Sequence, residues 1–161
     1  MHPVFRRLGE CGLVSVVMID SSAHAVPLAR ALLAGGVSAM ELTLRSETAL
    51  ESLRRIVAEV PGMMVGAGTI LSKEQVGEVL AAGADFGVAP GTNKKVLQAA
   101  RDQGLPFAPG VATPSDIESA LDFDFRVLKF FPAEAMGGLQ YLGNVASHYR
   151  HLGLRYIPLG G

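Results

Sequence analysis

Short apolar runs alternate with longer amphipathic stretches along the whole chain, a pattern typical of alternating strands and helices. The strand starts recur every roughly 20–28 residues, the spacing of one strand, one helix and two loops. Because the runs are apolar throughout, they predict a parallel sheet with both faces covered. The predicted strands are Leu13–Ile19, Ala39–Leu44, Met64–Thr69, Phe86–Pro90, Pro106–Val111, Val127–Pro132 and Arg155–Gly160.

Polar caps and glycines mark the ends of the amphipathic stretches between these strands. Hydroxyl side chains favour helix N-termini, and glycine favours the left-handed turn that follows a helix. The predicted N-terminal caps are Ser22, Ser46, Ser72, Thr92 and Thr113. The predicted closing glycines are Gly35 and Gly36, Gly83, Gly104 and Gly153.

The second predicted strand decides between an open sheet and a barrel. Its alternation places Glu41, Thr43 and Arg45 on one face and apolar side chains on the other. An open sheet with helices on both faces would bury these polar groups without partners, at a high cost. A barrel gives them a shared interior that opens at the carboxyl ends of the strands, where barrel enzymes place their chemistry. We therefore predict a (β/α)8 TIM barrel.

The count of elements falls short of a complete eight-stranded barrel. Seven strands are predicted, and the sequence ends at Gly161, directly after the seventh. We therefore expect a single barrel domain over residues 1–161, truncated after strand seven, with strand eight and the last helices absent from the given chain. A fragment of a longer protein is the favoured explanation, and a lost or disordered end or another way of completing the barrel is the alternative.

Composition and charge limit which partners and which cellular compartment we expect. The net charge is −1, so the chain has no excess of basic residues with which to bind a nucleic acid. No apolar run approaches the ~20 residues that span a bilayer. The only cysteine is Cys11, which suits a reducing compartment, and the N-terminus lacks an apolar signal core. We expect a cytoplasmic protein without a membrane or nucleic-acid partner, and without a metal, because no histidine falls on a strand end.

Lys129 is the most informative candidate for chemistry. It lies inside the apolar run Val127–Pro132, on the same face as Val127 and Phe131. Removing a lysine amine from water favours its uncharged form, which is a nucleophile. Glu41 could exchange protons with such an amine, and Arg45 could hold a substrate carboxylate. The alternative is an internal ion pair that only supports the barrel.

Weaker signals stand at the ends of other strands. Thr69 offers a hydroxyl after the small residues of Gly66–Gly68, and Pro90 ends an apolar run with a turn. Gly160 and Gly161 follow the seventh strand, where phosphate sites of such barrels lie. Each of these signals alone also fits tight packing or a simple turn.

Taken together, these motifs resemble one family. Glu41-Leu-Thr-Leu-Arg45, Gly66-Ala-Gly-Thr69, the Pro90-Gly91 turn, Pro109-Gly110 and Lys129-Phe-Phe-Pro-Ala-Glu134 occur in the order found in the 2-keto-3-deoxy-6-phosphogluconate (KDPG) and 4-hydroxy-2-oxoglutarate (KHG) aldolases. The resemblance covers the chain from about Gly12 to Gly161.

The resemblance implies a metal-free and cofactor-free class I aldolase that assembles as a homotrimer. It implies cleavage of 2-dehydro-3-deoxy-6-phosphogluconate to pyruvate and glyceraldehyde 3-phosphate, in the Entner–Doudoroff pathway. Lys129 would form the imine with the keto acid and Glu41 would be the general acid/base, acting through a water. The implied substrate-binding residues are Arg45, Thr69, Pro90, Lys129, Phe131, Gly160 and Gly161.

Several alternatives stay open at the level of sequence. Leu159 precedes the glycine pair where many members with the phosphogluconate substrate carry threonine. The substrate could therefore be 4-hydroxy-2-oxoglutarate or 2-dehydro-3-deoxy-6-phosphogalactonate. A different class of phosphate-binding barrel enzyme would leave Lys129 an electrostatic role only, and a fragment that only binds or assembles would have no turnover.

Overall fold

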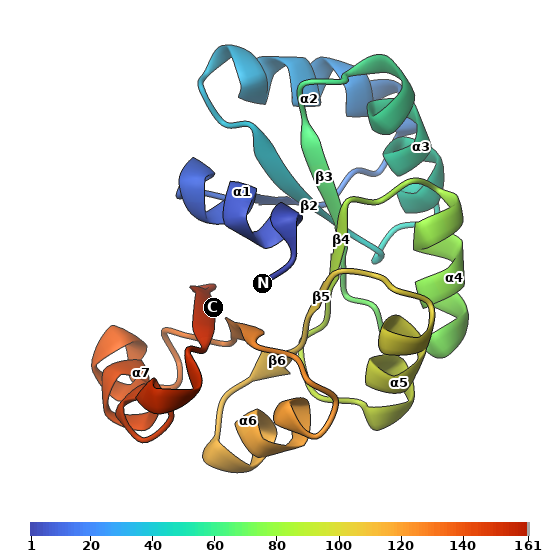
Figure 1. Cartoon of the computed structure of the whole chain (residues 1–161). Coiled ribbons are helices and arrows are strands. Elements are labelled where there is room, and N and C mark those ends of the chain that lie inside the picture. Colours follow the sequence, from blue (N-terminus) through green and yellow to red (C-terminus); the bar gives the residue numbers. More distant parts are fainter. Residues whose placement is uncertain (161) are drawn as a thin grey trace.

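Parallel strands form a curved wall with helices along its outside (Figure 1). The computed structural model describes residues 1–160. Its strands are β1 (Ser15–Val17), β2 (Ala39–Thr43), β3 (Met64–Gly68), β4 (Phe86–Val88), β5 (Phe107–Ala108), β6 (Gly110–Val111), β7 (Val127–Phe130) and β8 (Arg155–Pro158). Its helices are α1 (Pro3–Cys11), α2 (Ala25–Ala34), α3 (Ala49–Glu59), α4 (Lys73–Ala81), α5 (Lys94–Asp102), α6 (Pro114–Leu121) and α7 (Gly138–Ser147), with short 3-10 turns at Ser22–His24 and Arg150–Leu152.

Every strand pairing is parallel, in the order β1-β2-β3-β4-β5 and then β6-β7-β8. β5 and β6 are two halves of one extended segment, separated by Pro109, whose carbonyl accepts a hydrogen bond from the amide of Lys129. The seven predicted strands are thus all present, and the predicted parallel α/β architecture is confirmed. Over residues 1–160 no pairing joins β8 to β1, so these two strands form the edges of the wall.

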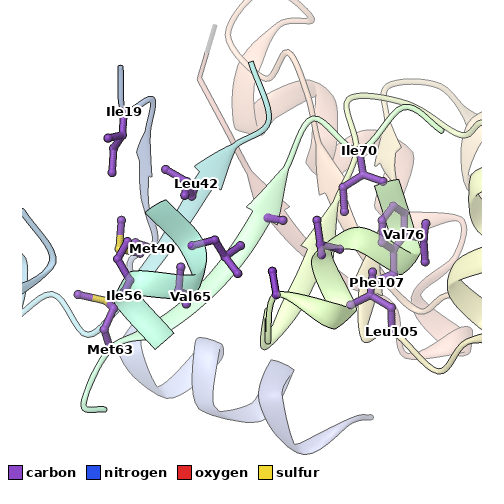
Figure 2. Close-up of a cluster of buried hydrophobic side chains, with 14 of the residues drawn as sticks. Ile19, Met40, Leu42, Ile56, Met63, Val65, Ile70, Val76, Leu105 and Phe107 are labelled. Carbon is purple, nitrogen blue, oxygen red and sulfur yellow. The ribbon is translucent and has the colours of Figure 1, made fainter. Parts of the chain in front are cut away.

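The larger core lies between the wall and the outer helices. Alternate strand residues such as Met40, Leu42 and Val65 face outward and pack against Ile56 of α3 (Figure 2). All four side chains are completely removed from water. Burial of a large aliphatic side chain contributes about 1.5–3 kcal/mol, so this outer layer supplies most of the apolar stabilisation of the fold.

The N-terminal helix α1 was not predicted from the sequence. Its apolar residues Val4, Phe5 and Leu8 pack against side chains of five strands, four of which contribute their first residue. They form a separate buried cluster with Ala39, Met64, Phe86, Ala108 and Val127. The helix therefore closes the amino-terminal end of the barrel, and the carboxyl-terminal end is left for chemistry.

The helix boundaries follow capping chemistry at some predicted positions and not at others. Ser72 and Thr113 form complete capping boxes, as their positions predicted. The predicted caps Ser22, Ser46 and Thr92 are wrong, because α2, α3 and α5 begin after His24, Thr48 and Asn93. The hydroxyl of Ser46 donates instead to the carbonyl of Ile19. None of the helices described over residues 1–160 is long and apolar enough to cross a bilayer.

Candidate active site

Glu41 and Lys129 meet in the interior of the barrel. Lys129 Nζ donates hydrogen bonds to Glu41 Oε1 at 2.9 Å and to Oε2 at 3.1 Å. The two residues are 88 positions apart in the sequence, and their strands β2 and β7 are not neighbours in the sheet order. The contact therefore crosses the inside of the wall, which is possible only because the sheet curves.

Strand alternation explains why both side chains point inward. On β7, Leu128 packs outward against the α6 layer, and Val127 joins the inner cluster beneath α1. Lys129 shares the face of Val127. On β2, Met40 and Leu42 face outward in the same way, so Glu41 faces Lys129.

The pair is almost fully removed from water, with 5% of Glu41 and 6% of Lys129 exposed. Lys129 Nζ and the Glu41 carboxylate form a buried salt bridge. An amine adds to a carbonyl carbon through its lone pair, so a proton must leave Nζ before Lys129 can react. Glu41 is the adjacent acceptor for that proton.

Gly68 makes room for this pair. It ends β3 directly beside Thr43 of β2 in the strand register. A Cβ atom built at Gly68 would overlap the carboxylate of Glu41. A Cβ at Gly66 would likewise overlap the ring of Phe86. The two glycines of the Gly66–Gly68 motif thus omit side chains where the interior is filled from neighbouring strands.

Replacement of Gly68 by alanine is expected to displace the Glu41 carboxylate and lower kcat by about 10²-fold, since a shift near 1 Å at a reacting group has that effect. Steady-state kinetics on the purified variant measure this. Gly143→Ala is the control, because a Cβ at Gly143 in α7 meets nothing within 4 Å. Unchanged kcat in Gly68→Ala would show that the carboxylate position is not critical.

The other predicted site residues lie at the same end of the barrel. Thr69 and Phe131 directly follow β3 and β7, while Arg45, Pro90 and Gly160 lie two residues beyond β2, β4 and β8. Because all strands are parallel, these positions share the carboxyl-terminal edge of the wall. Among residues 1–160, no hydrogen bond joins these side chains to the Glu41–Lys129 pair. Gly161 lies outside the described residues.

Phe131 is the apolar neighbour of the amine. The centroid of its ring lies 5.6 Å from Lys129 Nζ, within the range of a cation–π contact. Thr69 adopts a left-handed backbone conformation with φ of 61°, which ends β3 and turns the chain at the mouth. Arg45 is exposed, and its Nε donates to Thr43 Oγ1.

The Pro90-Gly91 turn packs closely against Gly110 and lies beside the start of α6. Gly110 lies so close that a Cβ there would overlap the carbonyl of Pro90. Beside the turn, Thr92 lies near Asp116, which pairs with the N-cap Thr113 in the capping box of α6. Burial works to raise the pKa of Asp116, but hydrogen bonds from the amides of Ala112 and Thr113 and from the two threonine hydroxyls hold that pKa below its usual value. Asp116 therefore stays ionised and ties the two loops together.

The residues described here offer a nucleophile and a proton acceptor, and no metal centre. Within residues 1–160, no group of three or more His, Cys, Asp and Glu side chains is placed to hold a metal ion. A lysine with an adjacent carboxylate is the arrangement expected for an amine that adds to a carbonyl carbon.

Comparison with known proteins decides the family. The family model described as KDPG and KHG aldolase matches residues 4–161. The chain belongs to the KDPG and KHG aldolase family. The resemblance drawn from the motifs is thereby confirmed, and with it the assignment of the chain to the aldolases.

Relatives and solved structures agree with this family. The 2-dehydro-3-deoxy-phosphogluconate aldolase of Dickeya dadantii is 45% identical over 149 residues, which are 92% of this chain and 69% of that protein. The KHG/KDPG aldolase of Escherichia coli is 42% identical over the same shares of the two chains. The 2-keto-3-deoxy-6-phosphogluconate aldolase of Zymomonas mobilis ZM4, solved with 3-phosphoglycerate, has a TM-score of 0.87 and 41% identity, over 92% of this chain and 69% of that one.

A further solved structure bears on the chemistry of the family. It is the KDPG aldolase of Legionella pneumophila, with pyruvate captured at low pH as a covalent carbinolamine intermediate. Its TM-score is 0.87 and its identity is 35%, over 92% of this chain and 71% of that one.

The sequence missed two features of this site. The first is the hydrogen bond that Thr43 accepts from Arg45. Strand alternation predicted that Thr43 faces inward, but it does not describe the turn after β2 on which this hydrogen bond depends. The overlap of Gly68 with Glu41 also needs the register between β2 and β3. The two glycines of Gly66–Gly68 were the one feature of the sequence that could have indicated this close approach.

Proposed function

We propose that this protein is a class I aldolase that cleaves 2-dehydro-3-deoxy-6-phosphogluconate to pyruvate and glyceraldehyde 3-phosphate. The observation that carries the proposal is the buried contact between Lys129 Nζ and Glu41. The names of the relatives supply the substrate. The carbinolamine in the Legionella enzyme supports the chemistry, because a carbinolamine is the product of an amine and a ketone.

In the proposed mechanism, Glu41 takes a proton from Lys129, and the Nζ lone pair adds to the C2 carbonyl of the substrate. The carbinolamine loses water and becomes a protonated imine. Removal of the proton of the C4 hydroxyl then breaks the C3–C4 bond, and the electron pair of that bond moves into the imine to give an enamine. Glyceraldehyde 3-phosphate leaves at this step.

The second half of the cycle returns Lys129 to its amine. The enamine takes a proton at C3, and water hydrolyses the resulting imine to release pyruvate. Glu41 gives and takes protons in these steps through a water. Arg45 and Thr69 bind the carboxylate end of the substrate, Pro90 and Phe131 line the pocket, and Gly160 and Gly161 hold the phosphate.

The test is reductive trapping. Borohydride added to the protein with pyruvate should reduce the imine and attach a three-carbon unit to Lys129, which peptide mass spectrometry locates. Phosphate-free pyruvate makes the test independent of the phosphate site. An intact protein without an adduct at Lys129 would exclude the imine mechanism and favour a different class of phosphate-binding barrel enzyme.

A second substrate has its own support. The Escherichia coli relative is named for both KHG and KDPG, and Leu159 places an apolar side chain next to the glycine pair in this chain. We therefore propose 4-hydroxy-2-oxoglutarate as the alternative substrate. Comparison of kcat/KM for the two keto acids and for 2-dehydro-3-deoxy-6-phosphogalactonate ranks them directly. We also propose that the protein works in the cytoplasm as a homotrimer.

A further inference from the structure

Thr43 lies between the reacting pair and the mouth of the barrel. It is the last residue of β2, two positions beyond Glu41 and therefore on the same inward face. Only 3% of it is exposed to solvent. Its register partner on β3 is Gly68, which has no side chain to contact it. A polar side chain so deeply buried needs hydrogen-bond partners, because an unpaired one destabilises the fold.

The hydroxyl of Thr43 has two such partners. It donates to the carbonyl of Val17 on β1 at 3.2 Å, and it accepts from Arg45 Nε at 3.4 Å. A hydroxyl carries a single proton. Since that proton is used by the Val17 carbonyl, only the oxygen lone pairs face Arg45. Thr43 can therefore serve Arg45 only as an acceptor, which fixes the direction of the hydrogen bond.

This contact selects one edge of the Arg45 guanidinium. The Nε hydrogen is used by Thr43, and the two terminal nitrogens keep their own N–H groups. Neither makes a hydrogen bond within residues 1–160. An arginine binds a carboxylate in a bidentate manner either through Nε and one terminal nitrogen or through both terminal nitrogens. Because Thr43 occupies Nε, a carboxylate can bind Arg45 in a bidentate manner only through the two terminal nitrogens.

We propose that Thr43 is a positioning residue, which anchors the Arg45 guanidinium so that its two terminal nitrogens receive the carboxylate of the keto acid. This inference rests on the proposed function, in which Arg45 binds that carboxylate. Arg45 is itself exposed and has a long, flexible side chain, so its orientation is lost unless something holds it. The buried hydroxyl of Thr43, on strand β2, fixes this orientation.

The variant Thr43→Val tests the role of the hydroxyl, because valine keeps the branched shape and removes the acceptor. We expect KM for the keto acid to rise about 10-fold, as for the loss of one hydrogen bond that orders a charged group, with kcat changed less than about 2-fold. Thr43→Ser keeps the hydroxyl and should match the unmodified protein in KM. Thr43→Ala is a second variant without a hydroxyl, for use if valine impairs folding. A lowered kcat with unchanged KM would overturn the proposal.

A double-mutant cycle separates positioning from general support of the fold. Lysine at position 45 keeps the charge but has no Nε to bond to Thr43. In the Arg45→Lys background, Thr43→Val should therefore change KM no further. Changes in KM that simply multiply would show that Thr43 does not act through Arg45.

Reductive trapping keeps this inference distinct from the proposed function. If the unmodified protein gives no adduct with pyruvate and borohydride, the proposed function fails, and the inference fails with it. If Thr43→Val reaches full labelling of Lys129 but needs about 10-fold more pyruvate for half-labelling, the inference is supported. If half-labelling needs the same pyruvate concentration as in the unmodified protein, the inference alone is wrong.

Discussion

Replacing Lys129 with arginine is expected to abolish turnover, with a loss on the order of 10⁴-fold or more, as for removal of a covalent nucleophile. Arginine keeps the positive charge and can pair with Glu41, but its guanidinium is not deprotonated in proteins and cannot add to a carbonyl carbon. The variant should therefore fold and still fail to react. The measurements are kcat for aldol cleavage and the mass of the protein after borohydride treatment with pyruvate.

Lys94→Arg is the matched control, because Lys94 is an exposed residue at the start of α5. It should keep full activity and full labelling at Lys129. Melting temperatures of both variants show whether the longer side chain disturbs the core at position 129. Measurable activity in folded Lys129→Arg would leave Lys129 an electrostatic role and support the reading of the protein as another class of barrel enzyme.

Replacing Glu41 with glutamine is expected to lower kcat by about 10²–10⁴-fold, the usual contribution of a general acid/base. Glutamine has the same shape and can accept a hydrogen bond from Nζ, but it cannot take up a proton. The step that suffers most should be removal of a proton from C3 of the pyruvate imine. Exchange of the methyl protons of pyruvate for deuterium, followed by proton NMR, measures that step without any cleavage.

The same variant should still reach full labelling at Lys129 with borohydride and saturating pyruvate, but more slowly, because the proton of Lys129 must then pass to water before the imine forms. Glu47→Gln is the control, because Glu47 is an exposed residue of the loop between β2 and α3. Exchange in Glu41→Gln at the rate of the unmodified protein would remove Glu41 from the mechanism.

The sequence predicted the parts of this fold that depend on local pattern. Strand alternation placed Glu41, Thr43 and Lys129 inside the barrel, and the structure agrees, because a period of two applies wherever a strand has one inner and one outer face. The capping boxes at Ser72 and Thr113 were also predictable, since they involve residues three positions apart.

The features that the sequence did not predict depend on contacts between distant elements. Helix α1 is stabilised by the amino ends of strands as far along the chain as Val127, so its role could not be inferred from its nine residues. The distance between Lys129 Nζ and Glu41 could not be predicted for a related reason. The burial of Lys129 was evident from the apolar run, but the distance to Glu41 depends on the curvature of the sheet between β2 and β7.

The two hydrogen bonds between Lys129 Nζ and the carboxylate of Glu41 affect which carbonyl compounds can react with the amine. In the resting protein the nucleophile is already occupied by an internal ligand, and any carbonyl compound must displace that ligand before it can react. With Arg45 in its proposed role, a small aldehyde has no carboxylate for Arg45 to bind and nothing to offset this displacement. We therefore expect such aldehydes to modify Lys129 more slowly than a keto acid does.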